Sequence, residues 1–331
     1  MYKLGFFCIF FASSLSIDAQ NTALADSIVK YQMPSGGWVK NQDWQKGADL
    51  AYISKCMKTG IGSTIDNGAT TSEMKVLAKV YAETHEKRYR ESFIRGLHYL
   101  LDMQYANGGW PQFYPARKDV KYASRITFND NAMVSVMLML RDVAENKDMY
   151  APLHISKSLR KRAMAAFNRG VDCILKCQVR KNGRLTVWCQ QHDEVTLAPA
   201  PARAFELASL TGHGETVDII LLLKSIPNPS DEVKASIRDA VEWLMAHAIK
   251  DKAIERYQRE DGRYDIRLVD RPNAPLLWAR YYDLETEEPF FCDRDGIPRK
   301  HLEDIGYERR NGYSWLGNSA ERVVNLSVIK N

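Results

Sequence analysis

Two short stretches place acidic and amide side chains where helices are expected to begin. They are "STIDNGAT" (63–70), with Asp66 and Asn67, and "ITFNDNAM" (126–133), with Asn129, Asp130 and Asn131. Carboxylate and amide oxygens bind hard cations such as calcium. The same side chains are ordinary N-caps, so capping would explain either stretch taken alone. The interest lies in their recurrence along one chain.

Two later stretches place an arginine at the expected start of a helix. Arg203 follows Pro201 by two residues, which favours a first helical turn, and Arg280 lies in "ARYYDLETEEP". If the four helices stack in register, two carboxylates and two guanidiniums gather at one end of the molecule. The local alternative is pairing within each helix, of Arg203 with Glu206 and of Arg280 with Asp283.

The elements that would position these residues repeat about every seventy residues. Each copy is an amphipathic helix that ends near a glutamine and is followed by a glycine-containing turn and a tryptophan. The glutamines are Gln32, Gln104 and Gln178, and a weaker fourth copy starts at Ala240 and leads to "DGRYDIRLV". A periodicity of this length is typical of stacked repeats.

A second helix is expected in each copy, over residues 64–86, 127–148, 198–215 and 272–289, because apolar residues recur there at three- and four-residue intervals. No hairpin could bury its apolar face alone, so neighbouring copies must supply the core. The sequence predicts an all-α fold of repeated helical hairpins. Short extended arms, formed by the glycine turns, would form a cleft at one end.

The N-terminus resembles a secretory signal. Lys3 precedes the weakly polar run "LGFFCIFFASSLSI", which is too short to span a membrane. We expect residues 1–19 to be a cleaved signal peptide and residues 20–331 to be a single catalytic domain. The mature protein would be secreted or periplasmic, would have no membrane anchor, and by default would be a monomer.

Composition narrows the kind of ligand. The net charge of +5 suits an anionic ligand, while the absence of clustered Lys/Arg runs argues against nucleic acid. Five cysteines remain after Cys8 leaves with the signal, and their spacing indicates neither a disulfide framework nor a zinc site. Arginines and aromatic residues recur near the C-terminus. Together these features point to an acidic polysaccharide.

Four tryptophans could stack on sugar rings, although a tryptophan is more often a core residue. They are Trp38, Trp44, Trp110 and Trp315. Trp110, in "NGGWPQFYP", is the one we expect to contact substrate.

The ordered motifs resemble the family-10 pectate lyases from about residue 25 to the C-terminus. The matching motifs are "SGGWVKN" (35–41), "STIDNGAT", "NGGWPQFYP" (107–115), "ITFNDNAM", "WCQQHDEVTLAPAPARAFELASLTG" (188–212), "RYYDLETEEPFFCDRDG" (280–296) and "YERRNGYSWLG" (307–317). The resemblance implies an (α/α) toroid and calcium-dependent β-elimination of polygalacturonate, the de-esterified form of pectin. The products would be 4,5-unsaturated oligogalacturonides.

The resemblance also implies roles for single residues. Asp66 and Asp130 would be the essential acids of the Ca²⁺ site, with Asn67 beside them, and Arg203 would be the base. Lys40, Arg280 and Arg294 would contact the substrate. Two positions depart from the family pattern: Val39 replaces a proline, and Asn131 replaces a second acid, which removes a negative charge near the metal.

The implied base poses a physical difficulty, because arginine normally stays protonated. A neutral Arg203 would need neighbouring positive charge, from calcium, Arg280 and Arg294, to lower its pKa. This predicts activity at alkaline pH.

Two other functions are open from the residues alone. A glycoside hydrolase acting on an acidic polysaccharide needs two carboxyl groups, which Asp66 and Asp130, or Asp193 and Glu194, could supply. A pectin-binding protein without turnover would need neither. Only elimination would yield an ultraviolet-absorbing product and require calcium.

Overall fold

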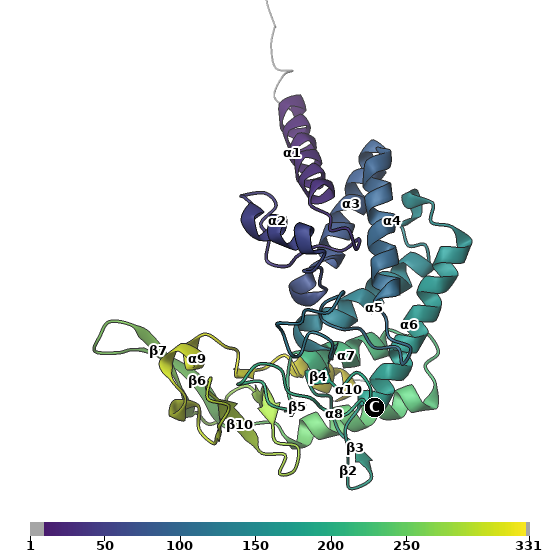
Figure 1. The fold of residues 1–331 in the computed structure, drawn as a ribbon. Coiled ribbons are helices and arrows are strands. Elements are labelled where there is room, and N and C mark those ends of the chain that lie inside the picture. The colour runs from purple at the N-terminus through teal and green to yellow at the C-terminus, as the bar shows by residue number, and fades with distance from the viewer. Residues whose placement is uncertain (1–9, 329–331) are drawn as a thin grey trace, which may run out of the picture. The chain divides into compact units, whose positions relative to one another are not determined.

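The computed structural model describes residues 10–328 of the chain (Figure 1). The chain forms two compact units. Unit 1 comprises Met1–Met103, Phe113–Arg117 and Met139–Ala165, and unit 2 comprises Gln104–Gln112, Lys118–Leu138 and Ala166–Asn331. The predicted signal peptide begins outside the described residues, and its cleavage stays a prediction.

Unit 1 is helical. Its elements are α1 (Phe10–Lys30), α2 (Leu50–Thr59), the 3₁₀ turn η1 (Asp66–Gly68), α3 (Thr71–Thr84), α4 (Lys87–Asp102) and the 3₁₀ turn η3 (Ala151–Leu153). Its core contains large buried side chains, among them Trp38, Phe93 and Tyr99. Helix α3 lies within predicted segment 64–86 and packs on α4 and α1. The first predicted hairpin is therefore confirmed.

Unit 2 contains the remaining complete helices. They are the 3₁₀ turn η2 (Asn129–Asn131), α7 (Glu215–Lys224), α8 (Asp231–Ala246), the 3₁₀ turn η4 (Leu302–Asp304), α9 (Tyr307–Asn311) and α10 (Glu321–Val328). Helices α5 (Ala132–Ala144) and α6 (Lys157–Cys177) have residues in both units. Helix α5 confirms the prediction for residues 127–148.

The strands of unit 2 are mostly two residues long. They are β1 (Ile126–Thr127), β2 (Arg180–Lys181), β3 (Arg184–Leu185), β4 (Gln191–His192), β5 (Leu210–Thr211), β6 (Lys252–Gln258), β7 (Tyr264–Asp270), β8 (Trp278–Ala279), β9 (Tyr281–Tyr282), β10 (Pro289–Cys292), β11 (Pro298–Arg299) and β12 (Leu316–Gly317). Strands β11, β10, β9 and β5 form one antiparallel sheet in that order, and the others pair in twos. The fold is thus mainly helical, with short strands.

The copies of the repeat share two kinds of hydrogen bond, made by their glutamines and their tryptophans. The side-chain amide of each glutamine donates to a carbonyl about sixty residues later: Gln32 to Ser92, Gln104 to Ala166 and Gln178 to Ser236. Each tryptophan carbonyl accepts from a threonine amide: Trp38 from Thr64, Trp110 from Thr127 and Trp188 from Thr211. These bonds confirm three of the predicted copies.

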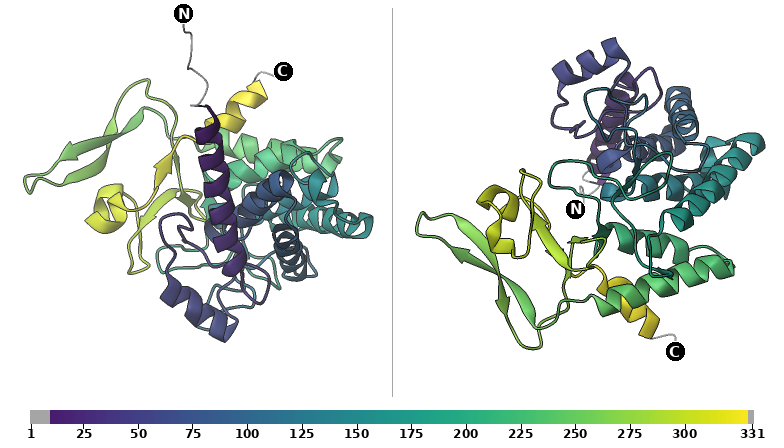
Figure 2. Two further views of the ribbon diagram at one scale, coloured as in Figure 1. Left: turned by 90° about the horizontal axis from the view of Figure 1, so that it is seen from above. Right: turned by 60° about the horizontal axis from the view of Figure 1, so that its bottom comes forward.

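The fourth copy is built differently from the prediction. "DGRYDIRLV" forms the tip and second strand of a hairpin, β6–β7, which extends away from the helices of unit 2 (Figure 2). The tryptophan of this copy is Trp278, whose indole donates to the carbonyl of Leu244 at 2.7 Å. The hairpin is therefore an insertion between α8 and β8.

The helices predicted over 198–215 and 272–289 are wrong. Residues 198–209 are irregular, because Pro199 and Pro201 lack an amide hydrogen and restrict the residues before them. The second helix of the third copy is α7, which starts after Gly214. Residues 272–289 form strands and a turn in which Asp283 accepts from the amides of Glu285 and Thr286.

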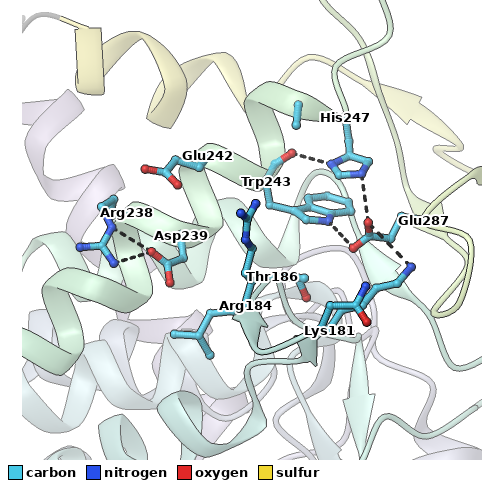
Figure 3. A pocket seen from close by; sticks show the side chains of 12 residues that line it. Lys181, Arg184, Thr186, Arg238, Asp239, Glu242, Trp243, His247 and Glu287 are labelled. Atoms are coloured by element: carbon cyan, nitrogen blue, oxygen red, sulfur yellow. Dashed lines mark hydrogen bonds and ion pairs between the residues drawn. The ribbon is translucent and has the colours of Figure 1, made fainter.

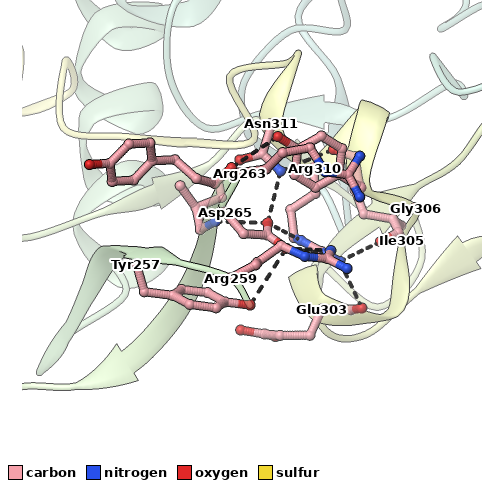
Figure 4. A network of polar contacts seen from close by, with 12 residues as sticks. Tyr257, Arg259, Arg263, Asp265, Glu303, Ile305, Gly306, Arg310 and Asn311 are labelled. Atoms are coloured by element: carbon pink, nitrogen blue, oxygen red, sulfur yellow. Dashed lines mark hydrogen bonds and ion pairs between the residues drawn. The ribbon is translucent and has the colours of Figure 1, made fainter. Parts of the chain in front are cut away.

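The hairpin is fastened to the segment around α9 by one buried carboxylate, Asp265 (Figure 4). Its two oxygens accept from Nε and Nη2 of Arg310 at 2.8 and 2.7 Å, and one also accepts from Asn311 at 2.8 Å. Arg259 adds a contact at 3.2 Å. The guanidinium of Arg310 holds the pKa of Asp265 well below its usual range, so this carboxylate stays charged.

Other predictions concern the cysteines and the membrane. Cys173 and Cys177 are buried free thiols with their sulfurs 3.9 Å apart. Within residues 10–328, no helix combines the length and apolar character needed to cross a bilayer.

Candidate functional site

The two polar stretches adopt the same backbone turn two residues after the threonine that bonds the tryptophan. In η1, Asn67 has φ 52° and ψ 32°, and in η2, Asp130 has φ 50° and ψ 33°. Asn and Asp tolerate this left-handed conformation better than most residues. Asp66 of the first turn therefore corresponds to Asn129 of the second, and Asn67 corresponds to Asp130.

In unit 1, the turn presents a buried carboxylate with one oxygen to spare. Lys40 forms an ion pair with Oδ2 of Asp66, whose side chain is only 3% exposed. Oδ1 of Asp66 is buried and has no hydrogen-bond partner in the structure. The neighbouring Asn67 donates to Oδ1 of Asn41 at 2.9 Å. A buried carboxylate oxygen without a partner is costly, and a cation would satisfy it.

In unit 2, the corresponding turn joins a buried polar network. Asn129 accepts through Oδ1 from Gln190 at 2.9 Å and from Arg280 at 3.3 Å. Both donors also reach Oε1 of Glu215, at 2.9 and 2.6 Å. Glu215 is the first residue of α7, so its carboxylate also lies at a helix N-terminus. Arg280 pairs with Glu215 and not with Asp283, which was the local alternative.

Asp130 lies at the edge of this network. Its Oδ2 accepts from Nδ2 of Asn129 at 2.8 Å, and its Oδ1 is 4.0 Å from Nη2 of Arg280. Burial works against the charged form of Arg280, but the surrounding carboxylates, Glu215 foremost, keep its pKa above the usual range. Oε2 of Glu215 and Nε of Arg280 are buried without partners. The network thus has polar atoms still able to bind a ligand.

A chain of hydroxyls continues from this network to the predicted base. Tyr281 donates to Oε1 of Gln190 at 2.5 Å, and its oxygen lies 2.6 Å from that of Tyr313. Tyr313 donates to Oε1 of Glu206 at 3.0 Å, and Glu206 binds Arg203. Burial raises the pKa of both tyrosines, so they remain protonated donors under alkaline conditions.

Arg203 lies in a turn, not at the start of a helix. Its Nε donates to Oε2 of Glu206 at 2.7 Å, its Nη2 pairs with Oε1, and its backbone amide also donates to Oε2 at 3.1 Å. The side chain of Arg203 is 45% exposed, whereas that of Glu206 is 4% exposed. The hydrogen bonds to Glu206 raise the pKa of Arg203, which is opposite to the direction expected for a base.

Arginines gather around two aromatic rings. The guanidinium carbons of Arg203, Arg309 and Arg294 lie 4.8, 4.5 and 5.8 Å from the centroid of Phe205. That of Arg280 lies 4.7 Å from the centroid of Tyr313. The two rings contact each other edge-on at 5.2 Å. The structure therefore brings the three predicted arginines into one cluster with Arg309, which the sequence analysis did not assign. Such a cluster suits carboxylate-bearing ligands.

The prediction that Trp110 contacts substrate is wrong. Trp110 has no exposed surface, and its ring packs against Gly170, so it is a core residue. Trp38 and Trp315 are buried as well. Trp44 alone of the four is partly exposed; its indole donates to Oε1 of Glu73 at 2.8 Å.

The second pair of acids considered for hydrolysis is tied to an arginine. Arg125 pairs with Asp193 and with Oε2 of Glu194, the latter at 2.9 Å. Amides of Thr196 and Val195 lower the pKa of Asp193 to about 2, so it cannot hold the proton a general acid needs. The adjacent His192 is buried, and burial lowers its pKa to about 4.

The part of the chain that the structure describes contains no preformed metal cage. Within residues 10–328, no three His, Cys, Asp or Glu side chains are grouped to hold a metal ion. The donor chemistry fits calcium nevertheless, because Asp66 offers an unpartnered buried carboxylate oxygen and Asp130 offers a carboxylate at an equivalent turn. A calcium ion at either turn would need further oxygen ligands, from water or substrate.

A cavity of about 750 Å³ in unit 2 contains none of the predicted site residues. It lies between α8 and the β2–β3 turn (Figure 3). Its charges are largely paired with one another: Arg238 with Asp239, and Lys181 and His247 with Glu287. We assign it no part in catalysis.

Several residues of the network had no predicted role. They are Gln190, Glu215, Tyr281, Arg309 and Tyr313. Glu215 could have been found by aligning the copies on their threonines, which places "TGHGE" beside "TIDNG" and "TFNDN". No local sequence pattern indicates the two tyrosines, because strand β9 and the segment before β12 bring them to the site from distant parts of the chain.

Solved structures define the class of this protein. The chain is similar to a family 10 polysaccharide lyase from Cellvibrio cellulosa, with 32% identity, a TM-score of 0.80, and 96% of each chain covered. It is equally similar to an aspartate-to-alanine mutant of such a lyase from the same organism in complex with trigalacturonic acid, covering 96% of this chain and 97% of that one. The protein is therefore a polysaccharide lyase.

The family follows from the sequence match. The model of the pectic acid lyase family matches residues 32–324, so the chain belongs to that family and is a pectate lyase. None of the curated proteins compared with the chain matches it. The resemblance drawn from the motifs is confirmed.

Proposed function

We propose that this pectate lyase cleaves polygalacturonate by calcium-dependent β-elimination and releases 4,5-unsaturated oligogalacturonides. The observation that carries the proposal is the cluster of Arg203, Arg280 and Arg294 around Phe205 and Tyr313. A polymer with a carboxylate on every sugar needs such a surface. The complex of the similar lyase with trigalacturonic acid supports the same substrate.

The reaction assigns Arg203 the role of base. In its neutral form, a guanidine nitrogen of Arg203 takes the proton from C5 of a galacturonate. The C5–H electron pair becomes the C4=C5 double bond, the C4–O4 bond breaks, and the departing oxygen takes a proton from water. Arg280 and Arg294 hold uronate carboxylates, and Lys40 is a further substrate contact. The side chain of Arg203 is 45% exposed, so a bound substrate could reach its guanidinium.

Calcium binding is assigned to Asp66, with Asn67, and to Asp130. Bound calcium would withdraw charge from the C6 carboxylate and so acidify the C5 hydrogen. Lys40 balances Asp66 in the present structure and would compete with a cation for it. Asn131 in place of an acid leaves the site with less negative charge, which predicts modest calcium affinity.

We further propose that the repeated hairpins close into an (α/α) toroid with a cleft at one end, and that the mature protein is a secreted or periplasmic monomer without a membrane anchor. The recurring glutamine and tryptophan bonds support the hairpin repeat. The N-terminal run after Lys3 supports export.

The hydrolase and the non-catalytic pectin-binding protein are the alternatives to test. Polygalacturonate is incubated with the purified protein across pH 7 to 11, with calcium or with EDTA, while ultraviolet absorbance is followed. The proposal expects an absorbing product that EDTA abolishes and that Arg203→Ala reduces at least about a thousandfold without loss of fold. Oligomers without absorbance would indicate hydrolysis, and binding without release of oligomers would indicate a binding protein.

A further inference from the structure

Arg203 binds Glu206 through both its side chain and its backbone amide. Glu206 is nearly fully buried, and its carboxylate accepts three hydrogen bonds from the predicted base, from Nε, Nη2 and the backbone amide of Arg203. The loop is closed from both sides, since Ala202 N donates to Glu206 O and Glu206 N donates to Arg203 O. A carboxylate that binds two nitrogens of one guanidinium fixes the plane of that group.

The buried side of Glu206 is held in turn. Tyr313 donates to Oε1 of Glu206, and the oxygen of Tyr313 is 2.6 Å from that of Tyr281. Neither oxygen of Glu206 lacks a partner. Glu206 is therefore the fixed end of the pair, and the exposed guanidinium is the end that a ligand could reach.

We propose, resting on the function above, that Glu206 is the positioning residue of Arg203: it orients the guanidinium and sets how alkaline the medium must be before Arg203 can accept a proton. A negative charge in contact with arginine stabilises its protonated form, so Glu206 opposes loss of that proton. Contact with Glu206 therefore fixes the orientation of the guanidinium but lowers the fraction of Arg203 that is neutral at a given pH.

Other charged or titratable groups face Arg203. They are Tyr313 after α9, Arg309 on α9, Arg294 after β10, and Tyr122. The two arginines favour loss of a proton from Arg203, but Glu308 binds both of them, with Nη2 distances of 3.0 Å to Arg294 and 2.7 Å to Arg309. Glu206 is the carboxylate that touches Arg203 itself. Its effect should therefore exceed theirs.

The test compares kcat and kcat/KM of the full chain from pH 7 to 11 for the wild type and for Glu206→Gln, with calcium and polygalacturonate. In Glu206→Gln, the rise of kcat with pH (the alkaline limb) is expected at least one pH unit lower, because the negative charge beside Arg203 is gone. The plateau kcat is expected to fall at least tenfold, because the guanidinium is less tightly held. Glu206→Asp retains the charge and is expected to keep the limb within half a unit of the wild type while kcat falls.

Glu308→Gln is the matched control, since it removes the same charge from the same cluster but from Arg294 and Arg309. Because Glu308 does not touch Arg203, the pH profile of Glu308→Gln should move by less than half a pH unit. A limb that Glu206→Gln leaves in place, or a plateau kcat that it leaves unchanged, would overturn the proposal. If Glu206→Gln does not fold by circular dichroism, the comparison passes to Tyr313→Phe. This variant removes the hydrogen bond from Tyr313 to Glu206, so the carboxylate stabilises the protonated form of Arg203 more strongly and the alkaline limb should move to higher pH. A limb that does not move to higher pH overturns the proposal.

These experiments distinguish a failure of the proposed function from a failure of the role proposed for Glu206. A wild-type protein that gives no unsaturated product, or an Arg203→Ala variant that retains turnover, contradicts the assigned reaction or base. Only a wild type that is active and dependent on Arg203, together with an unmoved limb in Glu206→Gln, contradicts the role of Glu206 alone.

Discussion

Asp66 and Asn129 occupy the same position of a repeated turn, two residues after the threonine whose amide bonds the tryptophan carbonyl. Both side chains are buried. One is a carboxylate paired with Lys40, and the other is an amide that accepts from Gln190 and Arg280. The turn itself is therefore compatible with either side chain. Replacing the carboxylate by an amide should change the charge at this position without disturbing the fold.

Asp66→Asn is expected to fold normally, because the equivalent turn already carries asparagine. Loss of the charge removes a calcium ligand and leaves Lys40 without a counter-ion, so lyase activity should fall more than about a hundredfold. Initial rates measured against calcium concentration would check this. A variant with wild-type activity at the same calcium concentration would exclude Asp66 from the metal site.

Glu215→Gln tests the anchor of Arg280. The change leaves a buried guanidinium without its nearest counter-charge, which should cost about 3 kcal/mol of unfolding free energy and raise KM for polygalacturonate at least about tenfold. Thermal melts and steady-state kinetics measure the two effects. Glu232→Gln, on the exposed first turn of α8, is the control and should change neither. An unchanged KM in Glu215→Gln would mean that Arg280 does not depend on this contact.

Asp239→Arg tests the repeat. Arg95 and Arg169 each donate to the Oε1 atom of the glutamine that bonds their helix, Gln32 and Gln104. Asp239 stands at the matching position of the third copy, three residues after Ser236, and Oε1 of Gln178 is buried without a partner.

An arginine at position 239 is expected to supply the missing donor and to stabilise the protein by about 1 kcal/mol. Denaturant unfolding would show it. Glu242→Arg makes the same charge change on the same helix and should have little effect. Equal stabilities of the two variants would show that the third copy does not follow the rule of the first two.

Asp265→Asn tests the attachment of the hairpin. Asp265 has a lower pKa in the folded chain than its unfolded value of about 3.9, so its contribution to stability is complete above that value and is lost as the pH falls through the folded pKa. At pH 7 the variant should lose about 3 kcal/mol, because Arg310 is left buried without its partner.

Below pH 4, the melting temperature of the wild type should fall toward that of Asp265→Asn, so the difference between the two melting temperatures should become smaller. Asp261→Asn, which removes an exposed partner of Arg263 at the hairpin tip, is the control and should cost less than about 1 kcal/mol. A difference between wild type and Asp265→Asn that is constant from pH 7 to 3 would contradict this account.

The helical hairpins were predictable where periodicity was uninterrupted. Helices α3 and α5 fall inside the predicted segments, because apolar residues follow a 3.6-residue period with no proline in either helix. The segment around Arg203 has similar apolar spacing, but Pro199 and Pro201 prevent a helix there. The arginine nevertheless pairs with Glu206 as the local alternative proposed, since a tight turn brings residues three apart together as well as a helix does.

The site was predictable in its residue types and less so in its contacts. The copies pointed to Arg280, but its partner is Glu215, sixty-five residues away, which no local pattern indicates. Trp110 shows the opposite error. Its glycine-flanked motif suggested a sugar platform, whereas close approach of Gly170 buries the ring.

The bond between each tryptophan carbonyl and its threonine amide uses backbone atoms alone, and in the fourth copy Gly317 lies opposite Trp278 in the antiparallel pair of β12 and β8. Two residues further on, the four copies carry Asp66, Asn129, His213 and Ser319. An ancestral duplication of this module could thus diversify its chemistry one side chain at a time, while the scaffold that presents those side chains needed no redesign.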